Sequence, residues 1–229
     1  MKRYIVECDF GIPEAWADRD DIDLLHHAAT EYLADKWDET TPHNMVEGDP
    51  KMKELEKLGV TAFAGYQSNY GIDLNEWWVH PRIKRFFDKH GYIVVGAEYF
   101  YFAPHHVMDI HIDGAYYCRK AKFNWASHKD HTFRFFEPKD SIEGMRDGIQ
   151  SATSAYSWGF DESQVVLQEE APQGTPSLVC VGVPHQVING SQPLELFNVC
   201  VWKKGTRRDE DLGGMDMEEA LEDFKDYVL

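Results

Sequence analysis

The spacing of hydrophobic and polar residues changes near Tyr92. Before it, apolar residues recur at the three- and four-residue intervals of an amphipathic helix, as at Ile22, Leu25 and Ala29. Acidic residues precede this stretch, where the helix dipole favours negative charge. The pattern predicts a mostly helical layer over residues 1–91, opened by one short strand.

Two shorter helices are expected later in this layer. They cover residues 51–58 and 81–90, and each is followed by a glycine (Gly59 and Gly91) at the position where helices commonly end. Pro81 is compatible with the first turn of the second helix.

From Tyr92 onward, runs rich in β-branched and aromatic residues alternate with turn residues. They predict strands over residues 92–102, 109–113, 121–126, 132–136, 163–167, 177–183 and 194–202. Short strands without long helices between them favour an antiparallel sandwich or barrel. The expected architecture is mainly β with flanking helices. A jelly-roll core over 92–204 is packed by the N-terminal helices and by a C-terminal helix over 215–229, in a single domain spanning 1–229.

Composition narrows the range of partners. The chain has 229 residues, with 23 Lys and Arg against 40 Asp and Glu, which gives a net charge of −17. This balance argues against bare nucleic acid as a partner, because phosphate binding needs a basic face. No apolar run is long enough to span a membrane, the opening does not resemble a secretory signal, and the four cysteines form no close pair. We therefore expect a soluble, cytoplasmic protein with reduced thiols.

The most informative segment is Met108–Gly114, which contains His111 and Asp113. On a strand, residues two apart point to the same face, so these two side chains project together while Ile110 and Ile112 face the other way. Alone, this pattern is more typical of a hydrogen-bonded polar pair without a metal.

A second histidine changes the balance. An apolar strand runs to Pro184 and then His185, and the proline fixes the backbone just before the imidazole. Two imidazoles and one carboxylate are the ligand set of non-haem Fe(II) oxygenases, which leaves part of the metal's coordination shell open. Two other histidine clusters, His105–His106 and His128–His131, are expected to be solvent-exposed.

These motifs together resemble the Fe(II)/2-oxoglutarate-dependent oxygenase superfamily, whose core is a double-stranded β-helix of cupin type. The match extends over about half the chain, and its motifs are Glu98–Phe102, His111–Gly114, Lys122–Trp125 and Pro184–Asn189. The resemblance implies that His111, Asp113 and His185 bind Fe(II). It also implies a dioxygenase that couples decarboxylation of 2-oxoglutarate to hydroxylation of a substrate.

One departure concerns the cosubstrate. Many members place an arginine about ten residues after the second histidine, where it pairs with the far carboxylate of 2-oxoglutarate; this chain has Glu195 there. The candidate replacements are Lys122, Arg134 and Arg119, and Lys122 is favoured because it shares a strand face with Asn124.

Several aromatic residues and two alternatives complete the interpretation. Tyr99, Tyr101 and Trp125 are expected to shape the pocket. The substrate is a small molecule or a protein side chain, and the oligomeric state is not predicted. One alternative is a cupin-type metalloenzyme that uses the same three ligands without 2-oxoglutarate. The other is a non-catalytic jelly-roll module for binding or structure.

Overall fold

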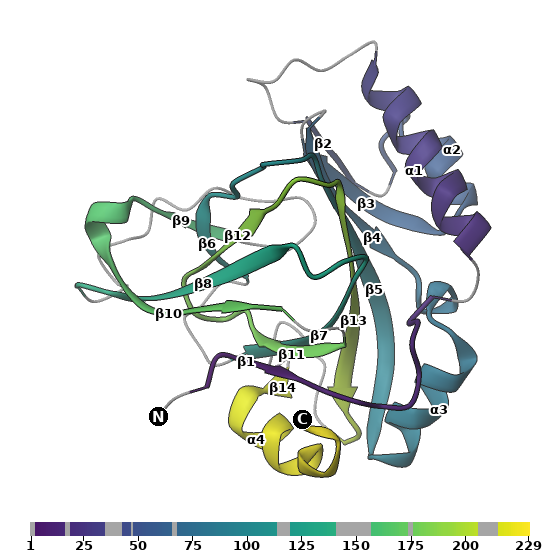
Figure 1. Cartoon of the computed structure of the whole chain (residues 1–229). Coiled ribbons are helices and arrows are strands. Elements are labelled where there is room, and N and C mark those ends of the chain that lie inside the picture. The colour runs from purple at the N-terminus through teal and green to yellow at the C-terminus, as the bar shows by residue number, and fades with distance from the viewer. Residues whose placement is uncertain are drawn as a thin grey trace.

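Two antiparallel β-sheets face each other in the computed structural model of the chain, and helices flank the larger sheet (Figure 1). The residues described are 3–16, 19–34, 43–46, 48–65, 68–113, 120–140, 157–173, 176–205 and 215–229. The strands are β1 (Ile5–Glu7), β2 (His43–Val46), β3 (Val60–Gly65), β4 (Asn69–Leu74), β5 (Tyr92–Phe102), β6 (Ile110–Asp113), β7 (Lys120–Ala126), β8 (His131–Pro138), β9 (Ser157–Phe160), β10 (Val165–Pro172), β11 (Ser177–Cys180), β12 (His185–Asn189), β13 (Leu194–Lys203) and β14 (Met215–Asp216). The helices are α1 (Arg19–Ala34), α2 (Lys53–Lys57), α3 (Pro81–Lys89) and α4 (Met217–Asp223), with short 3-10 turns at η1 (Glu76–Trp78), η3 (Glu162–Gln164) and η4 (Lys225–Tyr227).

The strand order identifies the architecture. The large sheet runs β1-β11-β7-β13-β5-β4-β3-β2 with β14 beside β7, and the small sheet runs β10-β8-β12-β6-β9. From β5 to β8, and again from β11 to β13, successive strands alternate between the two sheets. This alternation places β5-β13-β7-β11 opposite β6-β12-β8-β10, which is the jelly-roll arrangement of a double-stranded β-helix. The expected mainly β, cupin-like fold with flanking helices is confirmed.

Both faces of the small sheet carry clusters of buried apolar residues. Its inner face packs on the main core between the sheets, whereas a second cluster lies on its outer face and consists of Ile110, Ile112, Phe136, Phe160 and Val165. The two isoleucines thus point away from His111 and Asp113, as the alternation along the strand predicts. Apolar packing on the outer face leaves the inner face of β6 free to present polar groups.

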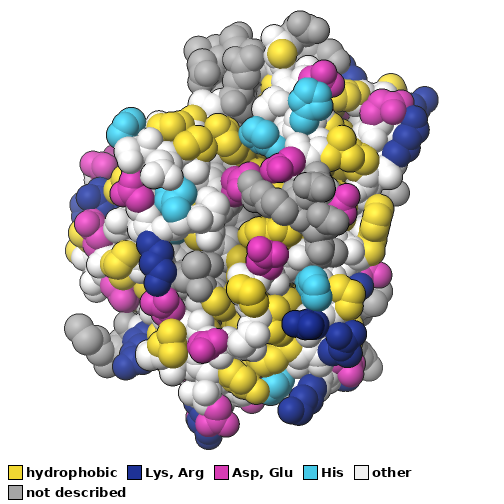
Figure 2. Space-filling view, turned by 45° about the vertical axis from the view of Figure 1, so that its right-hand side comes forward, with side chains coloured by type: hydrophobic (Ala, Val, Ile, Leu, Met, Phe, Trp, Pro, Cys, Tyr) yellow, Lys and Arg dark blue, Asp and Glu magenta, His cyan; other side chains and the backbone are white. Residues whose placement is uncertain are grey.

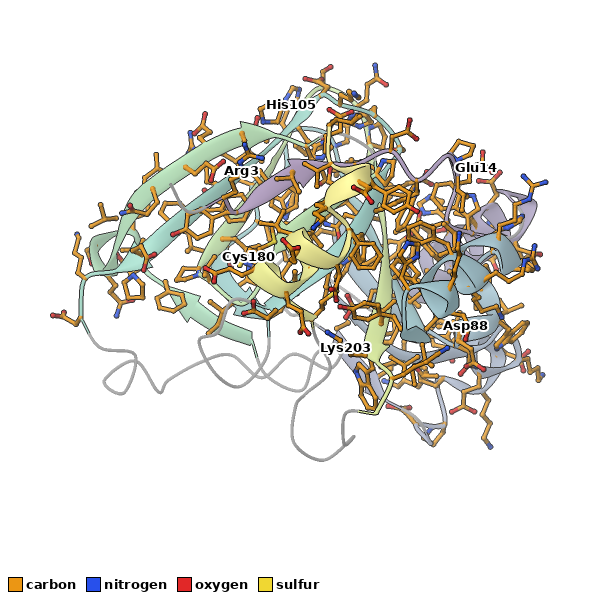
Figure 3. The ribbon with its side chains drawn as sticks, turned by 90° about the horizontal axis from the view of Figure 1, so that it is seen from below. Arg3, Glu14, Asp88, His105, Cys180 and Lys203 are labelled. Atoms are coloured by element: carbon orange, nitrogen blue, oxygen red, sulfur yellow. The ribbon has the colours of Figure 1, made fainter. Side chains whose placement is uncertain are left out.

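Two helices, α3 and α4, pack against the large sheet. α3 begins at Pro81, buries Ile83 and Phe87, and contacts β5 before the chain turns at Gly91 with a positive φ of 83°. α4 is capped by the Asp216 carboxylate, which accepts hydrogen bonds from two backbone N–H groups of its first turn. Figure 3 shows α4 beside Cys180 of β11.

The prediction of a mostly helical layer over residues 1–91 is wrong in its second half. β2, β3 and β4 lie within it and extend the large sheet beyond β5. β3 and β4 form a hairpin in which Gly65 has a φ of 146° and lies so close to Tyr70 that a β-carbon would clash. Each of these two strands is only six residues long, and the hydrophobic period of so short a segment does not distinguish a strand from a helix.

The remaining boundaries differ in detail. The expected C-terminal helix over 215–229 is interrupted, because β14 pairs with β7 before α4 begins and α4 ends at Asp223. The strand expected over 163–167 is a 3-10 turn followed by β10, and the strand expected over 177–183 ends at Cys180. β9 and β12 are additional strands.

Cys8, Cys180 and Cys200 are not disulfide-bonded, and Cys118 lies outside the described residues. Within the described ranges, none of the helices combines the length and apolarity needed to cross a bilayer. On the face shown in Figure 2, lysine and arginine side chains lie in several separate places with acidic side chains among them.

Candidate metal centre

The three predicted ligands come together between the sheets. His111 and Asp113 lie two residues apart on β6, and His185 is the first residue of β12. The two strands pair with His185 directly opposite His111. The loop before β12 is held by two backbone hydrogen bonds, since the N–H of Asp113 donates to the carbonyl of Val181 and the N–H of Phe136 donates to that of Pro184.

Both imidazoles are oriented by the backbone in the same way. The Nδ1 of His111 lies 2.8 Å from the carbonyl oxygen of Asp109, and the Nδ1 of His185 lies 2.9 Å from that of Val183. A carbonyl only accepts hydrogen bonds, so each Nδ1 carries the proton and each Nε2 has a free lone pair when the ring is neutral. Outer-shell hydrogen bonds of this kind are typical of metal-binding histidines.

The spacing of the donor atoms fits one ion. The Nε2 of His111 is 3.5 Å from Oδ1 of Asp113, and the ring centroids of His111 and His185 are 4.4 Å apart. One ligand atom from each of the three residues lies within 4.8 Å of the others. Bonds of about 2.1 Å place donors at most about 4.2 Å apart, so a small contraction closes the set on a divalent metal.

Lys122 lies directly behind Asp113. Its Nζ donates to Oδ2 of Asp113 over 2.9 Å and to Oε2 of Glu98 over 2.6 Å. The same oxygen of Glu98 accepts a hydrogen bond from Nδ2 of Asn198 over 3.2 Å. Asp113 therefore uses one oxygen for Lys122 and turns the other towards His111, where a metal would take it.

These contacts and burial set the charges. Burial opposes ionisation of Asp113, but Lys122 outweighs it and holds the pKa of this carboxyl well below its usual value. Burial would lower the pKa of Lys122, yet Asp113 and Glu98 together raise it. The pKa values of the two histidines shift in opposite directions. Burial and the neighbouring His111 lower the pKa of His185 to about 4, whereas the hydrogen bond with Asp113 overcomes burial and raises the pKa of His111.

A cavity of about 90 Å³ opens beside the three ligands. This is several times the 10–15 Å³ that one water needs. Its lining consists of Glu98, Phe100, Phe102, Met108, His111, Asp113, Lys122, Asn124, Phe133, Val181, His185, Val187, Leu196 and Asn198. Among the described residues, Oδ1 of Asn124 is buried without a hydrogen-bond partner, so this amide is available to a polar ligand.

The residues expected to bind the cosubstrate do not all lie at the cavity. Lys122 and Asn124 both line the cavity, in agreement with their predicted shared face. Arg134 does not reach it and its expected role needs correction. It alternates on β8 with the lining residue Phe133, so its side chain points outward and pairs with Glu170. Arg119 lies outside the described residues.

The aromatic residues expected to shape the pocket also need correction. Phe100 and Phe102 line the cavity, whereas Tyr99 and Tyr101 alternate with them on β5 and face the other side of the sheet. The Tyr99 hydroxyl donates to Glu195, and Trp125 packs against Phe10.

One histidine of the rival cluster His128–His131 is buried rather than exposed. His131 is 4% exposed, and its Nε2 is 3.1 Å from Oε1 of Gln173. Burial lowers its pKa. The nearest carboxylate in sequence, Asp130, binds the N–H and hydroxyl of Ser191 instead. Only His111, Asp113 and His185 form a possible metal-binding group within the described part of the chain.

Sequence reasoning missed Glu98 and Asn198. Both belong to a row of polar residues at paired positions across the large sheet, namely Asp73, Glu98, Asn198, Asn124 and Ser177. The signal that could have revealed Glu98 is its position two residues before Phe100 and four before Phe102, on the same face of the strand. A charge on an otherwise apolar strand face requires a partner.

No protein-family model matches the chain, and neither does any curated protein. Among solved structures, E. coli ycfD is similar with a TM-score of 0.38 and 13% identity over 79% of this chain and 53% of that chain. The vicilin from hazelnut (Corylus avellana) gives 0.31 and 11% over 59% and 30%, and that from Capsicum annuum gives 0.33 and 7% over 62% and 30%. The chain thus spans a third to a half of these proteins, and likenesses of this size assign neither family nor function.

Proposed function

We propose that this protein is a non-haem Fe(II) oxygenase that consumes a 2-oxo acid and hydroxylates a second substrate. 2-Oxoglutarate is the cosubstrate that the sequence resemblance implies. The observation that carries the proposal is the pair of buried imidazoles whose Nδ1 atoms are both held by backbone carbonyls, so that both Nε2 atoms are left to share one ion with Asp113. Such a set occupies one side of the metal and leaves the other side for ligands.

The overall reaction balances with O₂ as oxidant. The 2-oxo acid loses its carboxyl carbon as CO₂ and becomes the acid one carbon shorter, while a substrate C–H bond becomes C–OH. One oxygen atom enters each product, and the 2-oxo acid and the substrate each supply two of the four electrons that O₂ accepts. Bound Fe(II) supplies the O₂ activation that no side chain of the site provides.

The residues of the chain prepare the site for this reaction. His111, Asp113 and His185 hold the ion, and Lys122 keeps Asp113 ionised and fixed through Oδ2. We assign Lys122 and Asn124 to cosubstrate binding, since they supply a buried positive charge and an amide on one face of β7. The apolar residues that line the cavity, Phe100, Phe102, Phe133 and Val187 among them, surround the reacting groups with groups that do not hydrogen-bond to water.

Anaerobic titration tests the proposal. Fe(II)-loaded protein mixed with a 2-oxo acid should develop the weak visible charge-transfer band of a chelated complex, and His111→Ala should lose it together with the iron. Arg134→Ala is the matched control and should retain both. Absence of the band with every 2-oxo acid, despite bound iron, would contradict the assignment.

A second candidate uses the same metal without a 2-oxo acid. It is favoured by the state of Lys122, whose charge is already compensated by Glu98 and Asp113. It predicts stoichiometric iron but no oxo-acid-dependent CO₂ release.

A further inference from the structure

The cavity is polar at one end and apolar at the other. Along β5 its lining residues are Glu98, Phe100 and Phe102, which span about 13 Å at roughly 3.3 Å per residue. Glu98 lies beside Asn198, whereas Phe100 lies beside Leu196. The small sheet repeats this order, since His185 pairs with His111 and the next inward residue, Val187, pairs with Phe133.

Among the described lining residues, positive charge is confined to the polar end. Lys122 is the one cation among the described lining residues, and it touches the metal ligand Asp113 itself. The other end is lined by carbon and sulfur, from Phe100, Phe102, Met108, Phe133, Val187 and Leu196. The described residues of that end offer no counter-charge to a carboxylate, and burying a carboxylate unpaired is strongly unfavourable.

The net charge of the polar end also disfavours a ligand with two carboxylates. With both imidazoles neutral as ligands, the described lining carries one positive charge on Lys122 and two negative charges on Glu98 and Asp113. A divalent ion therefore brings the site to a single positive charge. One carboxylate neutralises it, whereas two leave a buried negative charge.

Glu98 is the residue whose charge makes a second ligand carboxylate unfavourable. It is 7% exposed and is held by Lys122 and Asn198, so it occupies the place on Lys122 that the second carboxylate of a ligand would need. Its cross-strand neighbour Asp73 adds no charge at neutral pH, because burial and then Glu98 raise the pKa of Asp73 to about 9.

We infer that the site prefers a 2-oxo acid with one carboxylate and an apolar tail over the dicarboxylate 2-oxoglutarate, and that Glu98 sets this preference. The inference rests on the proposed function, whose cosubstrate class it narrows. The carboxylate and keto oxygen would lie at the polar end and the tail between Phe100 and Val187.

Competing titrations test it by affinity rather than by turnover. The anaerobic Fe(II) protein is titrated with 4-methyl-2-oxopentanoate and with 2-oxoglutarate, and each Kd is read from the charge-transfer band. We expect the monocarboxylate to bind about tenfold more tightly to the wild type. Glu98→Gln should tighten 2-oxoglutarate about tenfold and change the monocarboxylate much less, because one buried negative charge is removed.

Two further variants separate this effect from damage to the fold. Asp73→Asn removes the neighbouring carboxyl outside the cavity lining and should leave both affinities unchanged. Val187→Thr keeps the shape of the apolar end but adds a hydroxyl, and should weaken the monocarboxylate about fivefold.

The outcomes are distinguishable. Tighter binding of 2-oxoglutarate by the wild type, or an unchanged preference in Glu98→Gln, overturns the inference and leaves the proposed function standing. Failure of both acids to give a band with iron bound overturns both.

Discussion

The protein contains two histidine pairs of similar spacing and different chemistry. The ring centroids of His111 and His185 are 4.4 Å apart, and those of His128 and His131 are 5.9 Å apart. In the first pair both rings use Nδ1 for a backbone carbonyl and turn Nε2 towards a shared space. In the second pair Nε2 is the atom already engaged, with Gln173 for His131 and with the carbonyl of Pro193 for His128.

The difference shows that proximity of imidazoles does not define a metal site. A site with two histidines and one carboxylate needs a free nitrogen on each ring and an ionised carboxylate within reach of both. Asp113 meets this condition because Lys122 keeps it charged in a buried place. The other pair has no carboxylate among its described hydrogen-bond partners, and the three-residue metal-binding group found in the described chain does not include it.

Removing one ligand should give the largest effect. His185→Ala deletes one of three donors, and we expect iron affinity to fall by more than the 10- to 100-fold typical of losing an outer-shell partner, at about 100-fold or beyond. Iron per protein after desalting measures it. His128→Ala is the control from the other pair and should retain full stoichiometry; iron loss there of equal size would make the two pairs equivalent.

Lys122→Met should produce the next largest effect, which is a loss of folding stability in the metal-free protein. It leaves Glu98 and Asp113 buried without their cation, which costs about 3–5 kcal/mol in the free energy of unfolding of the metal-free protein. Denaturant unfolding measures this loss. Adding Glu98→Gln should recover part of it, because one unpaired charge is then removed; a loss below 1 kcal/mol in the single variant would show that the two carboxylates do not depend on Lys122.

The pH dependence of metal binding should reveal the asymmetry within the first pair. His185 has a pKa of about 4, whereas that of His111 is raised above the ordinary value, so only His111 must lose a proton before binding metal between about pH 4 and 6. Affinity should then fall about tenfold for each pH unit of acidification, corresponding to one proton. Co(II) titrations over this range give the slope, and a slope of two protons would mean that both histidines titrate alike.

Much of this arrangement was predictable because it is local. The alternation over Ile110–Asp113 fixes which residues share a face, and β5 has the bounds that its dense β-branched and aromatic run predicts. The pairing of His185 with His111 is not local, and it was inferred only through a resemblance between distant motifs.

The failures have equally specific causes. β3 and β4 are too short for their period to exclude a helix, so the edge of the large sheet was read as helical. Tyr99 and Tyr101 were assigned to the pocket although strand alternation places them opposite Phe100 and Phe102. Glu98 was overlooked because its partner Lys122 is 24 residues away, and cross-strand pairing is invisible in a linear pattern.

Because cross-strand neighbours are not visible in the sequence, Lys122 and Arg134 were both candidates for the cation that binds the cosubstrate. The structure places Arg134 outside the cavity, so its removal should have the smallest effect of the variants considered. Arg134→Ala removes a half-exposed partner of Glu170, with relative exposures of 38% and 45% for the two side chains. Such a pair contributes about 0–1 kcal/mol, and the side chain lies on the face of β8 opposite Phe133. Unfolding free energy, iron content and 2-oxo acid affinity should therefore all stay close to the wild type. A tenfold loss of 2-oxo acid affinity in this variant would instead mean that cosubstrate binding extends to the outer face of the small sheet. Arg134, rather than the buried Lys122, would then be the cation that binds the cosubstrate.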